Sequence, residues 1–258
     1  MIRTGVRCLV LGVCVACAGN RSRPSGPPHD GQALLNQMRE AYLGKWFKNV
    51  TFTQMTTQTR PNGVTDTSTW YEALQSPARL RIDFGDPAKG NGVIYTADSL
   101  YVVREGKVTR TAATGNPFLP FVAGVYAQPM DTTLKQIAPY QFDLSKLRAD
   151  TADGRPVWVV GSTTPGDSTT PQFWVDKERL VVVRMIAAFN PAQPADVADI
   201  WLKDYKPVSG GWLAVKVEIK HGGQVIQKEE YSSWRGNVDL SPDFFVAEKW
   251  SAVPHWHR

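Results

Sequence analysis

The residue types that could carry out chemistry are few and scattered. The four histidines are His29, His221, His255 and His257. The sequence contains no Gly-x-Ser-x-Gly, His-Glu-x-x-His, phosphate-binding glycine loop or Rossmann fingerprint that would surround them with a catalytic motif. His255 and His257 alone, on a tail expected to be mobile, would make a weak metal site. The sequence therefore predicts a non-enzymatic protein with no catalytic residue, no metal and no cofactor.

Charged side chains form one further candidate. Asp83 and Asp86 lie close in sequence to Arg79 and Arg81. Two carboxyl groups beside two guanidinium groups could serve as an acid/base pair, but they also fit a charged surface facing water. We expect the solvated surface.

Cysteine occurs only at the start of the chain, as Cys8, Cys14 and Cys17. The remainder has no cysteine, so neither a disulfide framework nor a thiolate metal site can form there. Its stability must come from a hydrophobic core, and nine Trp, ten Phe and eight Tyr can supply one.

The N-terminus has the pattern of a secretory signal. Two arginines precede an apolar run over residues 8–16, which is far shorter than the ~20 residues of a membrane-spanning helix. The sequence Cys-Val-Ala-Cys at 14–17 resembles the lipobox of bacterial lipoproteins, with Cys14 where leucine is usual. That resemblance implies an acylated Cys17 as lipid anchor. Because Ala18 is not aspartate, sorting rules for such lipoproteins imply an outer membrane location, facing the periplasm.

An alternative uses the same residues. Ala16-Cys17-Ala18 also fits ordinary small-x-small secretory cleavage, which would leave a soluble periplasmic protein. We favour the lipoprotein, because an otherwise cysteine-free secreted chain has no other evident use for Cys17. Residues 18–30 are polar and rich in proline, which predicts a disordered tether.

The charge balance gives little support for nucleic-acid binding. The formal net charge is +5, but four arginines and a single acid precede Gly31. The part expected to fold is nearly neutral and has no dense basic patch, so we expect no nucleic-acid partner.

Most of the chain alternates with the period of β-strands. Leu80, Ile82 and Phe84 alternate with charged residues, and short turns connect them to further strands at 93–95, 100–103 and 107–108. Further strands are expected at 50–59, 67–74, 156–160, 172–175, 180–187, 199–205, 212–220, 224–234 and 240–246. Strands joined by such short turns pair antiparallel.

Helical patterns occur once before the strands and again within them. Asp30 is a suitable N-cap for a helix to about residue 43, with Leu34, Leu35 and Met38 on one face. Residues 116–126 are apolar almost all round, and Asp131 could cap a second short helix. Together these elements predict a mainly β (α+β) fold, in which a strongly curved antiparallel sheet is covered by an N-terminal helix and an inserted helical lid.

The order of these elements resembles the outer-membrane lipoprotein-sorting proteins, the LolA/LolB-like superfamily. The resemblance is carried by the leading helix and by residues 70–84, 95–101, 173–184 and 205–212, and it covers most of 31–250. It implies an incomplete β-barrel whose apolar concave face holds acyl chains under helices. In lipoprotein carriers an arginine precedes the proline that matches Pro77, whereas Ser76 stands here, so lipid binding fits better than the exact carrier role.

The chain is accordingly divided into a signal peptide with a lipobox cysteine (1–17), a tether (18–30), one LolA/LolB-like lipid-binding domain (31–250) and a C-terminal tail (251–258). We expect an envelope lipoprotein that binds a lipid or an acylated protein and is anchored to the membrane. The alternative is an interaction or stress-sensor module on the same fold, with an envelope protein partner at loops such as 161–171. The candidate cavity wall is Phe52, Leu80, Ile82, Val182, Ile200 and Val215, and the candidate lid is Phe118, Phe121, Val122 and Tyr126.

Overall fold

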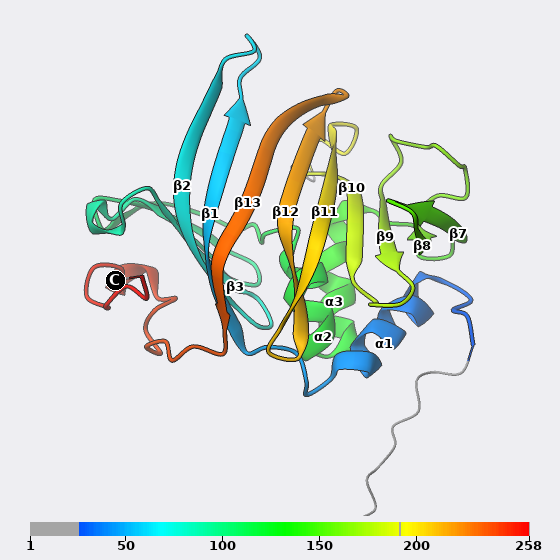
Figure 1. Cartoon of the computed structure of the whole chain (residues 1–258), viewed down its shortest axis with the longest axis horizontal. Helices are drawn as coiled ribbons and strands as arrows, with labels where there is room; N and C mark the ends of the chain where they lie inside the picture. The colour runs from blue at the N-terminus through cyan, green and yellow to red at the C-terminus, as the bar shows by residue number, and fades with distance from the viewer. Residues whose placement is uncertain (1–25, 191, 258) are drawn as a thin grey trace, which may run out of the picture.

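A computed structural model describes residues 26–190 and 192–257, which form one curved antiparallel sheet with helices on one face (Figure 1). The predicted signal peptide, Cys17 and most of the predicted tether lie outside the described residues. The helices are α1 (Gly31–Tyr42), α2 (Val125–Ala127) and α3 (Met130–Ile137), with a π-helical turn η2 (Pro120–Gly124) and shorter 3-10 turns η1 (Pro87–Lys89), η3 (Ala138–Tyr140) and η4 (Ala247–Lys249). The strands are β1 (Asn49–Thr59), β2 (Thr65–Gln75), β3 (Arg79–Phe84), β4 (Gly92–Tyr95), β5 (Leu100–Arg104), β6 (Lys107–Ala112), β7 (Leu147–Ala152), β8 (Arg155–Val160), β9 (Gln172–Asp176), β10 (Val182–Ala188), β11 (Val197–Val208), β12 (Gly211–His221) and β13 (Gln224–Gly236).

The strand order explains how the sheet acquires its cover. It runs β6-β5-β4-β3-β2-β1-β13-β12-β11-β10-β9-β8-β7, so the first and last strands pair at the centre. β6 and β7 follow one another in sequence yet form the two opposite edges. The segment that joins them must cross the sheet, and it carries the π-helical turn, α2 and α3. The predicted fold class, an unclosed curved sheet with helices on it, is confirmed.

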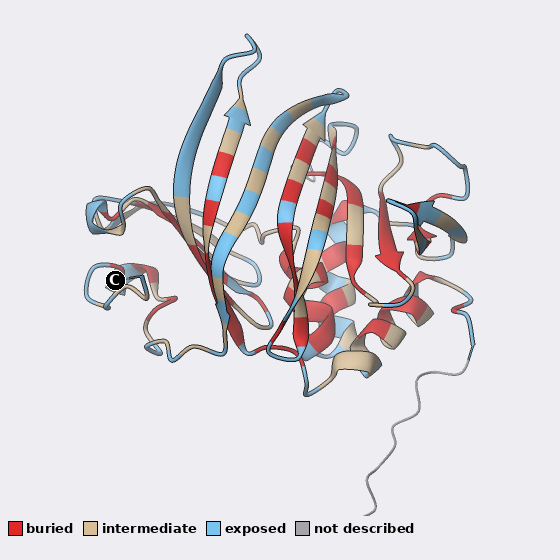
Figure 2. Ribbon diagram, viewed as in Figure 1, coloured by how far each residue is buried: buried red, intermediate tan, exposed pale blue. Residues whose placement is uncertain are grey.

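Helix α1 begins where its sequence predicts. The Asp30 carboxylate accepts a hydrogen bond from the Ala33 backbone N–H at 2.7 Å, which satisfies one of the unpaired donors of the first turn. Leu34, Leu35 and Met38 are fully buried on the face towards the sheet. Burial in Figure 2 is concentrated where the helices cover the strands, whereas the far ends of β2 and β13 are exposed.

Two local predictions were wrong, and one strand was missed. The N-cap of α3 is Pro129 without a side-chain bond, and Asp131 lies inside the first turn, where its charge suits the helix dipole. β7 was missed because it is an edge strand with a single buried residue, Ala152. Residues 240–246 form turns rather than a strand, because Pro242 lacks an N–H and the Phe244 N–H bonds the Ser241 carbonyl at 2.9 Å.

The convex face of β3 and β4 is covered by the C-terminal segment, residues 240–257. Arg81 and Asp83 form a bidentate ion pair there, with both bonds at 2.9 Å, and their side chains are only 3% and 1% exposed. The expectation that these two residues face water was therefore wrong. The Arg81 guanidinium lies 3.7 Å from the centre of the Trp250 ring, so its charge is covered by an aromatic face.

The same segment holds one of the C-terminal histidines in place. His255 Nε2 lies 3.2 Å from an Asp83 oxygen, and its side chain is 12% exposed. Gly92 permits this packing, because a Cβ there would lie 2.6 Å from the Trp250 ring. His255 thus belongs to a packed structural cluster and not to a mobile tail.

Candidate functional site

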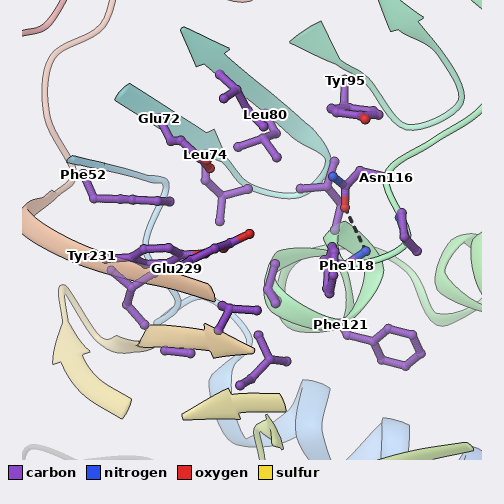
Figure 3. A pocket seen from close by; sticks show the side chains of 18 of the residues that line it. Phe52, Glu72, Leu74, Leu80, Tyr95, Asn116, Phe118, Phe121, Glu229 and Tyr231 are labelled. Atoms are coloured by element: carbon purple, nitrogen blue, oxygen red, sulfur yellow. Dashed lines mark hydrogen bonds between the residues drawn. The ribbon is translucent and has the colours of Figure 1, made fainter. Parts of the chain in front are cut away.

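A cavity of about 320 Å³ lies between the concave face of the sheet and the segment that crosses it (Figure 3). This volume falls at the lower end of the range for small-molecule sites. Its wall comes from β1, β2, β3, β4, β11, β12 and β13, and its cover comes from residues 116–126. Helices and strands far apart in sequence thus enclose one mostly apolar space.

Strand register brings the wall residues into rows. Phe52 of β1 lies opposite Glu72 of β2, which lies opposite Ile82 of β3. Leu74 and Leu80 form the neighbouring pair. Residues directly opposite in an antiparallel sheet project from the same face, so one face of these strands supplies a continuous surface to the cavity.

The cover is fixed to the sheet by aromatic packing. The rings of Tyr126 and Trp46 stack with their centres 3.7 Å apart, and the Tyr126 hydroxyl donates to the Leu180 carbonyl at 3.0 Å. Phe121 packs against Phe173 with ring centres 4.9 Å apart. These contacts hold residues 118–126 over the concave face without filling the cavity.

A hydrogen bond fixes the start of the cover, and exposed apolar side chains lie at the opening of the cavity. The Asn116 side-chain oxygen accepts a hydrogen bond from the Phe118 backbone N–H at 2.9 Å, drawn as a dashed line in Figure 3. Phe189 and Ile226 also line the cavity, yet they are 43% and 36% exposed. Large apolar side chains that face both a cavity and water mark the place where an apolar ligand would enter.

The candidate residues from the sequence fall into two groups. Three wall candidates, Phe52, Leu80 and Ile82, line the cavity, as do all four lid candidates, Phe118, Phe121, Val122 and Tyr126. The other three wall candidates, Val182, Ile200 and Val215, are buried in the core cluster under the helices and do not line it. These three residues belong to the same buried cluster as Leu34, Leu35 and Met38 of α1. A side chain that points to the concave face therefore need not lie at the cavity.

Sequence reasoning missed the acidic residues of the wall. Glu72 is 5% exposed, and burial together with the nearby Glu229 raises its pKa well above the ordinary value of 4.5. Burial also raises the pKa of Glu229, although hydrogen bonds from Tyr231 and Gln227 act in the opposite direction. The available signal was position, since Glu72 falls between Trp70 and Leu74 on the inward side of β2.

Other kinds of site find little support. Within residues 26–190 and 192–257, no group of three or more His, Cys, Asp or Glu side chains is arranged to hold a metal ion. No helix in these ranges is long and apolar enough to cross a bilayer. Ser76 donates its hydroxyl to the Phe47 carbonyl at 2.9 Å and so fixes the chain beside the cavity.

Solved structures share this architecture at low sequence identity. A DUF1329 family protein from Desulfovibrio piger is 16% identical with a TM-score of 0.57, over 83% of this chain and 95% of that one. A LolA superfamily protein from Nitrosomonas europaea is 13% identical with a TM-score of 0.52, over 84% and 97%. A domain from Vibrio parahaemolyticus described as an outer membrane lipoprotein-sorting protein is 14% identical with a TM-score of 0.54, over 84% and 96%. No protein-family model and no curated protein matches the chain. The chain has a LolA-like fold.

Proposed function

We propose that this protein is a non-catalytic envelope lipoprotein that binds a lipid or acyl chain in the cavity, for lipid or lipoprotein transport or sorting. The observation that carries the proposal is the cavity of about 320 Å³ itself, apolar along the sheet and the cover and open past Phe189 and Ile226. The solved LolA superfamily and lipoprotein-sorting structures with this fold give it further support.

The physical basis is burial without bond making. Each CH₂ group that moves from water into an apolar site gains ~0.8 kcal/mol. One long acyl chain could therefore supply on the order of 10 kcal/mol before the costs of ordering and association are subtracted. Aromatic rings of the wall and cover, such as Phe52 and Phe118, provide the contact surface.

The alternative is a protein-interaction or stress-sensor module on the same fold. Such a module has no need for an interior ligand, and its own side chains would be expected to fill the space under the cover. The cavity here is instead left open between side chains of the sheet, such as Leu74 and Leu80, and Phe118 of the cover. This favours the lipid-binding function over the sensor.

A substitution that fills the cavity tests the proposal. Val217 lines the cavity from β12, whereas the neighbouring Lys216 is exposed on the other face. We expect Val217→Trp to weaken binding of a neutral amphiphile, decanol, by about tenfold or more, because the indole occupies the ligand's space. Lys216→Trp is the matched control and should bind as the unmodified protein does.

Isothermal titration calorimetry measures the affinity, and circular dichroism with thermal unfolding checks that both variants are folded. A folded Val217→Trp variant that binds decanol as tightly as the control would exclude this cavity as the binding site. Absence of binding to the unmodified protein would reject lipid binding itself.

A further inference from the structure

Two carboxyl groups line a cavity that is otherwise mostly apolar and aromatic. Glu72 belongs to β2 and lies opposite Phe52 of β1, and Glu229 belongs to β13 and lies opposite Thr56 of β1. Both side chains line the cavity, and Figure 3 shows them on the walls that face one another across it. The central strand thus separates two acids that share one enclosed space.

The Glu72 carboxyl group lacks a partner. Glu72 is only 5% exposed. Within the described ranges, no hydrogen bond or ion pair joins its carboxyl group to another residue. Buried polar groups in native proteins are nearly always paired, so an unpaired one calls for a specific explanation. Glu229, by contrast, is oriented by two hydrogen bonds of 2.6 Å, from the Tyr231 hydroxyl and the Gln227 amide.

Hydrogen-bond acceptors are in excess along this part of the sheet. Gln54, between the two acids on β1, is 1% exposed, and its side-chain oxygen also lacks a partner in the described structure. Its amide N–H is already used by the Thr56 hydroxyl at 2.8 Å. None of the described residues that line the cavity is Lys, Arg or His. The described lining therefore carries no positive charge, and the stretch beside the two acids has unpaired acceptor oxygens at Glu72 and Gln54.

Two acids without a basic residue among the described lining side chains favour some ligand head groups over others. A carboxylate or phosphate would bring negative charge to two acids with no basic residue among the lining side chains. A primary ammonium group brings three N–H donors and the opposite charge, and charge-assisted hydrogen bonds are the strongest available. Aromatic rings add to the attraction, since Phe52 and Tyr231 stack 4.3 Å apart beside the acids and Trp70 and Tyr95 also line the cavity.

We infer that the cavity accepts a cationic amphiphile, with a primary ammonium head group held by Glu72 and Glu229 and an apolar body under residues 118–126. This inference rests on the proposed function and specifies its ligand class. Glu72 supplies the unpaired acceptor, and Glu229 is already aligned by Tyr231 and Gln227. Residues Phe189 and Ile226 at the mouth provide an apolar route of entry.

Three amphiphiles with the same alkyl chain, decylamine, decanol and decanoate, separate head-group recognition from chain burial. Isothermal titration with the lipid-stripped protein near neutral pH is expected to give the order decylamine, decanol, decanoate. One charge-assisted hydrogen bond corresponds to about tenfold or more in affinity. Glu72→Gln should abolish the preference for decylamine over decanol. Glu229→Gln should reduce the same preference, as a second variant at an independent strand.

Glu230→Gln is the matched control, because Glu230 is the exposed neighbour of Glu229 on the other face of β13; it should keep the full preference. Equal affinity for decylamine and decanol, or a preference that survives Glu72→Gln, would overturn the inference while leaving lipid binding intact. Tightest binding of decanoate would overturn it as well. If none of the three amphiphiles binds, the proposed function fails and the inference fails with it.

Discussion

At the scale of single residues, the most unusual group is the Glu72 carboxyl in the cavity wall. Burial, and then the charge of Glu229, raise its pKa above 4.5, so the folded state binds this proton more tightly than the unfolded state does. The contribution of protonated Glu72 to the free energy of unfolding is fully present below about pH 4.5, and it is lost as the pH rises through the raised pKa. Tyr95, Tyr231 and Glu229 are the titratable groups with which it interacts.

We therefore expect Glu72→Gln to be progressively more stable than the unmodified protein as the pH rises above 4.5. Acids with lowered pKa values, such as Asp176 and Asp204, make the protein more stable as the pH rises. Comparing the variant with the unmodified protein at each pH cancels this contribution, because both contain these acids. Urea unfolding at a series of pH values measures it, with Glu230→Gln as the exposed control. A stability difference that does not change with pH would contradict the raised pKa.

The buried ion pair on the convex face gives a second prediction. Asp83→Asn leaves the Arg81 guanidinium buried without its counter-charge, which destabilises a fold by roughly 3–5 kcal/mol. Asp66→Asn is the control, because its partner Arg60 and Asp66 itself are 63% and 53% exposed, and such surface pairs contribute ~0–1 kcal/mol. Equal losses for the two variants in urea unfolding would show that Arg81 is not buried as described.

At the level of residues, the sequence predicted part of the apolar wall but not the acids. The alternation of residues 80–84 put Leu80 and Ile82 on one face, and both line the cavity. Glu72 and Glu229 were not singled out, because a carboxyl group in an alternating strand ordinarily faces water. The two acids lie inside because β13 pairs with β1 and because residues 116–126 cover the concave face of these strands.

At the scale of elements, the two faces of the sheet have separate covers. The concave face is covered by residues 116–126 and the helices, and the convex face of β3 and β4 by the C-terminal segment with Trp250. Trp250 is 2% exposed and packs on Arg81 and Gly92. The convex cover should therefore be required for stability but not for ligand binding.

Trp250→Ala tests this separation. Removal of the buried indole should lower the free energy of unfolding by about 3–5 kcal/mol, because the ring would leave a cavity and uncover the Arg81 guanidinium. Trp250→Phe should lower the free energy of unfolding by less than Trp250→Ala does. Decanol affinity of both folded variants should equal that of the unmodified protein in isothermal titration. A parallel loss of affinity would mean that the two covers are coupled.

Local patterns predicted most elements, and the failures have local causes. Alternation and short turns identified the strands from β1 to β5, the start of β6, and the strands from β8 to β13. β7 escaped because its residues are mostly polar and only Ala152 is buried. Residues 240–246 looked like a strand because Phe244 and Phe245 are apolar, but their rings pack against Ala73 from a turn. The central pairing of β1 with β13 joins residues far apart in sequence, which no local pattern reveals.

At the scale of the whole molecule, we propose that an acylated Cys17 holds the folded domain at a membrane. Cys17→Ser should release the protein without unfolding it, because residues 26–190 and 192–257 contain no cysteine whose loss could disturb the fold. Two or more acyl chains give stable attachment, and Cys17 would carry them. Membrane fractionation after signal removal measures the result.

Ser between Ala16 and Ala18 still permits small-x-small cleavage, so the variant should appear as a soluble protein or as uncleaved precursor. Thermal unfolding of the released form should match that of the parent. A parent protein that is already soluble, or a processed variant that stays equally membrane-bound, would contradict the anchor.

We propose that the cavity under residues 116–126 holds an amphiphile in the native protein. Native mass spectrometry of protein purified from its own membranes, without added lipid, tests it most directly. We expect a bound amphiphile that denaturation releases and that returns when the stripped protein is incubated with a lipid extract of those membranes. The Val217→Trp variant should contain no such amphiphile. An empty protein that takes up nothing from the extract would contradict it.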